Sequence, residues 1–573
     1  MVFTRAISRL CIAIVVLGCA TLSPAEPAIY VEPDHPVYEF IERLSAKRLV
    51  ELHVLAIRPK TRHEIATILS DIPRKSTRLT EQDRRRLRFY LGEFADELPS
   101  NHPARESDAA WWTLRATEQE KTHDYGLPWW RNLLRKRTLG VDNDVTLRPL
   151  VSLGADIGQD TAMTWSRKIR VGGWATFGSS WSAQAMMVED VEFGDGAAPP
   201  PRFGPERGVA FIDGTLGSSF SVDDPQALVT YSGRHATLSG GVFPLEIGHG
   251  RHANTILSDK APPLPHVQLT VHPTPALTFT YLHMFLQSGV PDTTSPWYTE
   301  SDGWQSRHLR KYFVLHRLDY AGRGFEIGLG ESVIYGARNL EPIYLIPVVP
   351  FRAAQHDVGD LDNLQMFVDG ALTAIPYTRV YGSFFIDEMA FEALTSRVMS
   401  HSWWAWQIGL LTTDVLGLIP NVDLRAEYTG ALPWAYHHRY PWNTYDTYAY
   451  HGNDPVVAYP LGFFNGHNSD YARFDIQWRP VWNVELTGSA SLSRRGSEGS
   501  IVEQYDTDAP AKEFLFGDVT RTYEYRFGVR WEFARDFFAS GMVSQTTRKT
   551  EDAGVTSARD WTTFSLGVTY RIW

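Results

Sequence analysis

Apolar and polar residues alternate in segment after segment through the second half of this chain. In segment 522–533, one set of alternate positions is apolar or aromatic: Tyr523, Tyr525, Phe527, Val529, Trp531 and Phe533. The other set includes Glu524, Arg526, Arg530 and Glu532. Successive side chains of a strand point to opposite faces, so this pattern suits a sheet with lipid on one side and water on the other. Segments 422–429, 472–479, 484–493 and 564–573 repeat it.

These segments predict a mainly β fold, an outer-membrane antiparallel barrel. Charges on the lipid face cost roughly 2–4 kcal/mol near the midplane, so the charged sets are expected to face the lumen. The alternative is a soluble sandwich with one buried face. The many Tyr and Trp residues at strand ends favour the barrel, because membrane girdles place them there. Residues 145–573 have room for about 16 to 18 strands.

Composition restricts the partners. The formal net charge is -11 and no basic stripe dominates the chain, which argues against nucleic acid. After the N-terminus, the sequence has no apolar run long enough for a helical span. A barrel is therefore the spanning form available, with outer-membrane lipid as a partner.

The first 25 residues are typical of a signal peptide. Arg5 and Arg9 precede the apolar stretch 10–17, and small residues precede a cleavage point after Ala25. The alternative is a lipobox over 16–19, which would make Cys19 a lipidated first residue. Cleavage after Ala25 removes both cysteines, Cys11 and Cys19, and places the mature chain in the outer membrane of a Gram-negative envelope.

Residues 26–106 carry a helical pattern in place of the alternating one. Apolar residues recur at helical spacing in 37–44, 61–72 and 80–94, and Thr80 resembles an N-cap with an acidic first turn. We expect three short helices in a small periplasmic bundle that docks on the barrel. Residues 107–144 combine tryptophans with a basic run, which favours a membrane-interface connector over a binding site.

Motifs for chemistry are not found in the sequence, and no catalytic residue, metal or cofactor is predicted. Asp387 and Glu388 are adjacent, so on a strand they point to opposite faces unless a bulge or turn intervenes. The same argument applies to His437 and His438, although both could lie in a loop. An outer-membrane hydrolase remains a less favoured alternative.

One segment carries a family resemblance. Residues 248–265 contain a glycine, Asn, Leu-Ser-Asp and Ala-Pro-Pro series that resembles the Wzi-type capsule assembly family: Gly248, Gly250, Asn254, Ser258, Asp259, Pro262 and Pro263. Further residues follow in the order such proteins show: Glu331, Asn363, Arg379 and Asp387, and then 460–470. The resemblance covers nearly the whole mature chain. It departs at Ile247, where the family commonly has Trp.

The resemblance implies a barrel with a periplasmic helical bundle that binds and organises capsular or exported polysaccharide at the cell surface. Such a protein would be lectin-like and non-catalytic, and a monomer is favoured. A sugar polymer needs hydroxyl partners and flat aromatic surfaces. The segment 434–443, which we expect to be an outer loop, supplies both: Trp434, Tyr436, His437, Arg439, Trp442 and Asn443. The alternative for this segment is an aromatic girdle with a packed loop.

The expected lumenal charges permit two interpretations. They are Arg317, Arg379, Asp387, Arg425, Glu427, Arg473 and Asp475. A cross-strand ion network that fills the barrel is favoured, because opposite charges pair readily in a polar interior. The alternative is a passage for charged or saccharide solutes, which would make the protein a porin.

Overall fold

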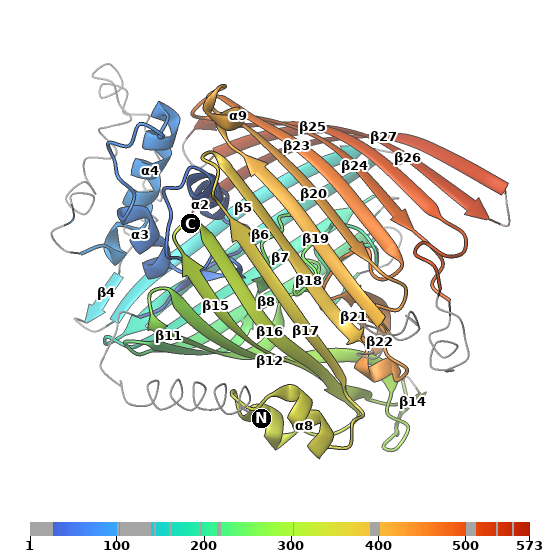
Figure 1. The fold of residues 1–573 in the computed structure, drawn as a ribbon. Helices are drawn as coiled ribbons and strands as arrows, with labels where there is room; N and C mark the ends of the chain where they lie inside the picture. Colours follow the sequence, from blue (N-terminus) through green and yellow to red (C-terminus); the bar gives the residue numbers. More distant parts are fainter. Residues whose placement is uncertain are drawn as a thin grey trace.

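The computed structural model describes residues 27–99, 102, 139–142, 145–159, 163–194, 197–214, 219–301, 303–389, 402–499, 512–534, 537–552 and 555–572. Its main body is a closed antiparallel barrel in which neighbouring strands follow chain order (Figure 1). Eighteen strands of the described residues form the wall: β5 (Val145–Gln159), β6 (Met163–Phe177), β7 (Trp181–Phe193), β8 (Ser219–Ser232), β9 (Ala236–Phe243), β11 (Leu264–Thr274), β12 (Leu277–Pro291), β15 (His308–Gly322), β16 (Phe325–Gly336), β17 (Asn363–Leu372), β18 (Thr378–Met389), β19 (Ser402–Thr412), β20 (Val422–Ala431), β23 (Ser469–Val481), β24 (Val484–Arg495), β25 (Thr520–Ala534), β26 (Phe537–Asp552) and β27 (Val555–Ile572). β27 pairs with β5 to close the ring, and β4 (Leu139–Asp142) extends along β5. The predicted fold class is confirmed.

The faces predicted from the alternation are confirmed. On β25 the apolar set is exposed on the outside of the barrel: Tyr525, Phe527, Val529, Trp531 and Phe533. On β20 the polar set is buried on the inside: Asp423, Arg425, Glu427 and Thr429. Trp573, the last residue of the predicted segment 564–573, lies outside the described residues.

The two ends of the barrel differ in the length of their connections. At one end, called the short-turn end, two-residue turns such as 323–324 and 482–483 join the strands. At the other, called the long-loop end, segments such as 337–362 and 432–468 join them. Outer-membrane barrels have short turns on the periplasmic side and long loops outside, which gives the barrel an orientation.

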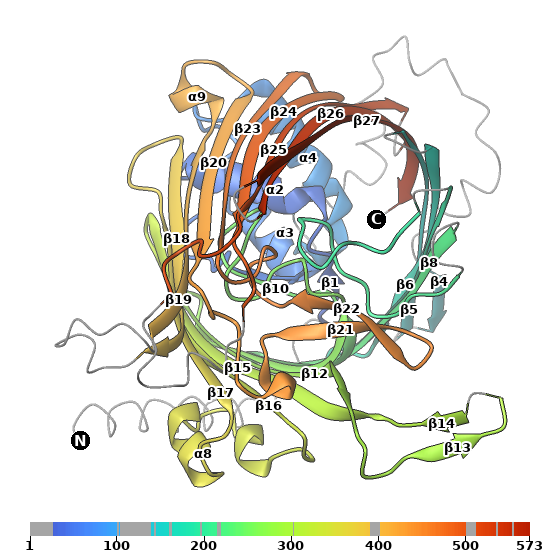
Figure 2. The same cartoon turned by 90° about the vertical axis from the view of Figure 1, so that its right-hand side faces the viewer.

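Three helices lie at the short-turn end, as predicted: α2 (Pro36–Ala46), α3 (Arg62–Ser70) and α4 (Glu81–Glu93). Capping boxes begin α3 and α4, through Thr61 with Glu64 and Thr80 with Asp83. The helices share an apolar core that includes Phe40. Figure 2, which looks along the barrel, shows α2 and α3 across its bore. None of the helices in the described part of the chain is long and apolar enough to cross a membrane.

Smaller elements complete the fold. They are β1 (Tyr30–Val31), β2 (Ile57–Arg58), β3 (Lys60–Thr61), η1 (Ala95–Glu97), β10 (Glu246–Ile247), β13 (Trp297–Thr299), β14 (Gly303–Gln305), η3 (Pro342–Leu345), α8 (Phe351–Asp357), α9 (Asp414–Gly417), η5 (Pro441–Asn443), β21 (Asp446–His451) and β22 (Asp454–Pro460). β1 pairs with β3, and β2 of the helical part pairs with β10. The predicted connector lies mostly outside the described residues, and the predicted domain boundaries stay predictions.

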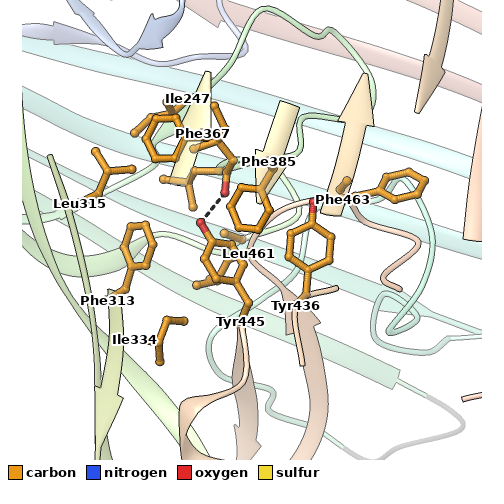
Figure 3. Packing of buried hydrophobic residues seen from close by; sticks show 14 of the residues in the cluster. Ile247, Phe313, Leu315, Ile334, Phe367, Phe385, Tyr436, Tyr445, Leu461 and Phe463 are labelled. Atoms are coloured by element: carbon orange, nitrogen blue, oxygen red, sulfur yellow. Dashed lines mark hydrogen bonds between the residues drawn. The ribbon is translucent and has the colours of Figure 1, made fainter. Parts of the chain in front are cut away.

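The lumen contains a hydrophobic core. Two segments supply its centre: the lumen loop, defined as residues 246–263, and the inner loop, defined as residues 432–468. Their buried side chains pack against inward-facing residues of β15 to β18 (Figure 3): Ile247, Tyr436, Tyr445, Leu461 and Phe463 against Phe313, Leu315, Ile334, Phe367 and Phe385. The part of the lumen beside β15 to β18 is therefore packed with side chains.

Candidate functional site

The lumen loop reaches from the helical domain to the opposite barrel wall. At its start, the Gly248 amide donates to the Ala56 carbonyl at 2.8 Å. In its middle, the amides of Arg251 and His252 donate to the Glu427 carboxylate on β20, at 2.7 and 3.0 Å. Tyr381 on β18 donates its hydroxyl to the same carboxylate at 2.5 Å. Glu427 therefore fixes the loop to the wall.

The loop also contacts the inner loop. The Ser258 amide donates to the Leu461 carbonyl at 2.8 Å, and its hydroxyl donates to the Gly462 carbonyl at 2.5 Å. Thr255 and Ser383 of β18 share a hydrogen bond between their hydroxyls at 2.7 Å. Together these contacts place the loop across the bore.

The glycines of the motif are required by packing. Gly248 has φ +135°, and a Cβ there would stand 2.5 Å from the Asn254 side-chain oxygen. A Cβ on Gly250 would stand 2.2 Å from Gln407 Nε2, which donates to the Ala253 carbonyl at 2.7 Å. Asn254 itself is buried, and its Oδ1 has no hydrogen-bond partner among the described residues. These motif residues therefore shape the loop inside the barrel.

The remaining loop residues of the motif are enclosed too. Arg379 donates to His249 Nδ1 at 2.7 Å, and burial together with this guanidinium holds the pKa of His249 well below its usual value. The histidine is thus neutral, as an acceptor must be. Burial and the nearby Glu246 raise the pKa of Asp259 to about 7. The buried pair Pro262 and Pro263 leads into β11.

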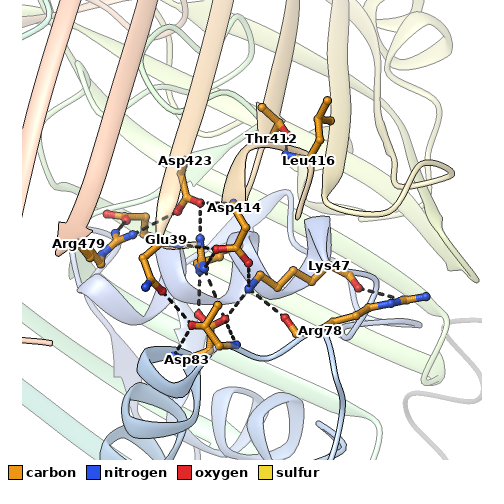
Figure 4. Close-up of polar contacts among 12 residues, drawn as sticks. Glu39, Lys47, Arg78, Asp83, Thr412, Asp414, Leu416, Asp423 and Arg479 are labelled. Carbon is orange, nitrogen blue, oxygen red and sulfur yellow. Dashed lines mark hydrogen bonds and ion pairs between the residues drawn. The ribbon is translucent and has the colours of Figure 1, made fainter. Parts of the chain in front are cut away.

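Buried ion pairs join the helical domain to the barrel (Figure 4). Arg43 contacts Asp83 of α4 at 2.8 Å and, on the barrel, Asp414 at 2.5 Å and Asp423. Lys47 lies 2.5 Å from both Asp83 and Asp414. Arg43 of α2 and Lys47, its C-cap, therefore meet carboxylates from the domain and the barrel at one buried point.

A second bridge lies beside this cluster. Glu42 of α2 accepts from Arg425 of β20 at 2.6 Å and from Arg58 at 2.7 Å. Burial alone would raise the pKa of Glu42, but Arg425 and Arg58 outweigh it and lower the pKa to about 2. Glu42 is therefore ionised at neutral pH and holds the domain on the wall.

The predicted ion network is confirmed in part: most of its members pair along single strands or with parts beyond the strands, and Asp387 has no ion pair among the described residues. Arg317 pairs with Asp319 on its own strand β15 and, at 3.0 Å, with Asp369 on β17. Arg473 and Asp475 pair at 2.8 Å. Two other predicted members contact segments that the strand pattern does not predict. Arg425 contacts Glu42 of the helical domain, and Arg379 contacts His249 of the lumen loop.

For the first half of 434–443, the structure agrees with the packed-loop alternative and not with an exposed outer loop. Trp434 is only 1% exposed and Tyr436 is buried, because the inner loop folds back into the bore. The Tyr436 amide donates to Asp387 at 2.7 Å, and its hydroxyl donates to the Thr255 carbonyl at 2.9 Å. His437 is half-buried, and its ring centroid lies 4.0 Å from that of His467. These residues belong to the filling of the barrel.

A bulge occurs at the adjacent carboxyls. The β18–β19 register shifts between Ile386 and Glu388. Asp387 is buried and accepts from the Tyr436 amide and, at 3.3 Å, from Gln365. Asp387 thus anchors the inner loop.

The second half of the segment forms a half-buried aromatic surface beside the exposed Arg439. Tyr440 and Trp442 stack with ring centroids 5.2 Å apart and an interplanar angle of 11°, and the Arg439 guanidinium lies 4.8 Å from the Tyr440 ring. We call these three residues the rim platform. Asn443 is buried beneath it: its side chain donates to the Leu361 carbonyl and its carbonyl accepts from Asn363, both at 2.9 Å. The motif residue Asn363 therefore helps to hold the platform.

Sequence reasoning missed a second aromatic surface. β13 and β14 form a hairpin at the long-loop end that projects beyond the wall (Figure 2). Tyr298 and Trp304 face each other across it, 5.7 Å between ring centroids, and are 60% and 74% exposed. We call this pair the hairpin platform. Aromatics on both sides of a Gly303 turn were the signal available in the sequence.

The motif residue Glu331 lies on the outer face of the barrel. It pairs with His316 at 2.7 Å and accepts from the Phe351 amide at 2.8 Å. Segment 342–354, with η3 and the start of α8, packs there over outward-facing Tyr281 and Tyr335. Glu331 therefore holds this external segment against the wall.

No protein-family model and no curated protein matches this sequence. Among solved structures, the chain is similar to Wzi, an outer-membrane protein involved in group 1 capsule assembly in Escherichia coli that is a carbohydrate-binding β-barrel. The two are 12% identical, with a TM-score of 0.54 over 95% of this chain and 100% of that chain. Two barrels from Pseudomonas aeruginosa are less similar, each at TM-score 0.40 over 76% of this chain: OccK5 (OpdH), 10% identical with 100% of that chain covered, and OprD, 11% identical with 97% covered. The likeness to Wzi shows a shared outer-membrane barrel fold.

Proposed function

We propose that this protein binds capsular or exported polysaccharide at the cell surface and organises it there without turnover. The observation that carries the proposal is the lumen loop, which crosses the bore from the helical domain to Glu427 on the wall. A general porin needs a water-filled passage from side to side. The packed core beside β15 to β18 and the docked helices favour a binding protein over that alternative.

The two aromatic platforms supply the chemistry for a saccharide. Sugar rings stack their C–H faces on flat aromatic surfaces, while their hydroxyls need directed polar partners. The rim platform offers a stacked Tyr440–Trp442 pair with Arg439 beside it, and the hairpin platform offers Tyr298 and Trp304. Both lie at the long-loop end, which is the outer side of such barrels. The Wzi likeness supports the same class of ligand.

The test compares cell-bound and shed polysaccharide in a deletion strain complemented with each version of the protein. Removing both platforms (Tyr298→Ala, Trp304→Ala, Tyr440→Ala and Trp442→Ala) should release polymer into the medium. Binding of purified protein to the isolated polymer should weaken about tenfold or more, because exposed aromatic anchors carry most of such binding energy.

The matched control removes an aromatic pair from the opposite end. Phe177 and Trp181 face each other across the β6–β7 turn and are 45% and 51% exposed. Their replacement by alanine should leave retention and affinity unchanged. Equal retention by the deletion strain and the parent would overturn the proposal, whereas loss in the deletion strain alone would reject only the two platforms.

A further inference from the structure

Helix α4 carries three exposed arginines on one side. Arg84, Arg85 and Arg88 have side chains that are 38%, 54% and 53% exposed. All three share one carboxylate, that of Glu81, with N–O distances of 4.0, 3.4 and 3.6 Å. One carboxylate neutralises one positive charge, so this group keeps an excess positive charge in a chain whose formal net charge is -11.

The helix follows the rim of the barrel at the short-turn end. Thr80, its N-cap, donates to the Asn421 side chain at 2.9 Å in the turn before β20. Gln82 donates to the Pro480 carbonyl near the end of β23 at 3.2 Å. One turn further, Arg86 lies within electrostatic reach of Glu485 on β24. α4 therefore runs along the wall and not only over the bore.

The rim beneath α4 is where lipid begins. The outward side chains at this end of β23 and in its turn are exposed and apolar: Trp478, Val481 and Trp482. Aromatic residues of this kind mark the level of the headgroups. Because a helix rises 1.5 Å per residue, Arg88 lies only about 12 Å along the axis from Thr80, which touches the wall.

We propose that the arginine face of α4, formed by Arg84, Arg85 and Arg88, binds the headgroups of anionic phospholipids in the leaflet at the short-turn end. Each basic side chain near an anionic membrane surface strengthens association about fivefold. This binding is independent of the polysaccharide proposal. It would hold the helical domain on the membrane surface in addition to the ion pairs that hold it on the barrel.

The experiment uses the full mature protein and measures the binding of single lipids by native mass spectrometry, with phosphatidylglycerol and phosphatidylcholine as probes. The parent should prefer phosphatidylglycerol. Replacing the three arginines together (R84Q, R85Q and R88Q) should lower the ratio of the two affinities at least fivefold, and added salt should lower it in the parent. Heat-modifiable gel migration should stay unchanged, because all three side chains are exposed.

The control removes the same number of exposed cations from the long-loop end: Arg310→Gln, Arg352→Gln and Lys512→Gln. Its phosphatidylglycerol preference should equal that of the parent. An unchanged ratio in the α4 variant, or an equal fall in both variants, would overturn the proposal. If soluble polyglutamate binds in an α4-dependent way while the lipid ratio does not change, the face serves a soluble polyanion and the lipid assignment is wrong.

Discussion

Replacing Arg43 with methionine should release the helical domain from the barrel. The guanidinium contacts Asp83, Asp414 and Asp423 in a buried cluster. Methionine fills similar space but carries no charge. Lys47 then remains as the cation that pairs with Asp83 and Asp414. Removing one partner of a buried ion pair costs about 3–5 kcal/mol. That cost corresponds to roughly two to three and a half powers of ten in an equilibrium constant.

We expect this free-energy cost to appear as separation of the helical domain from the barrel. Asp83 belongs to the helical domain and Asp414 to the barrel, so separating the two parts returns the unpaired carboxylates to water. We expect faster amide hydrogen exchange in α2, with unchanged exchange in β25 and β26. The control is Arg521→Met, because Arg521 pairs with Glu551 at 3.1 Å at an exposed site and should matter by less than about 1 kcal/mol. Unchanged exchange in α2 of the Arg43 variant would refute the reasoning.

Further predictions concern the lumen, the rim and pH. Gly250→Ala should lower the thermal midpoint measured by circular dichroism, at a cost of about 1–3 kcal/mol, because its Cβ would overlap Gln407; an unchanged midpoint would contradict the packed loop. Trp434→Ala should cost about 3–5 kcal/mol in urea unfolding, since the ring is buried, whereas Trp442→Ala should cost about half as much or less, since that ring is only half-buried; equal costs would contradict these placements. The pKa of Glu42 falls from 4.5 to about 2 on docking, so its stabilisation is complete above pH 4.5 and is lost as the pH falls toward 2. Exchange in α2 should accelerate over that window, and an onset above pH 5 would contradict this role.

The barrel wall could be predicted because lipid imposes a period of two on every spanning strand. The faces of β20 and β25 follow from that rule alone. Helix α4 could be placed from Thr80 and its acidic first turn, since capping is a local interaction. Both signals need only neighbouring residues.

The filling of the lumen could not be predicted in the same way. Glu427 accepts a hydrogen bond from the amide of Arg251, which is 176 residues away in the chain. A periodic sequence pattern does not predict such a long-range contact. An aromatic-rich sequence is compatible with an exposed loop and with a loop folded inward. The different burial of Trp434 and Trp442 could therefore not be predicted from the sequence. The hairpin aromatics Tyr298 and Trp304 could have been predicted from the sequence, because they flank a turn.

Single-channel conductance of the refolded mature protein in a planar bilayer tests the central claim most directly. A lumen filled by the lumen loop and the inner loop, and capped by docked helices, predicts insertion without stable ohmic steps. Reproducible porin-sized steps from the unmodified protein would contradict the closed barrel, and with it the proposal that the protein works by binding at its rim.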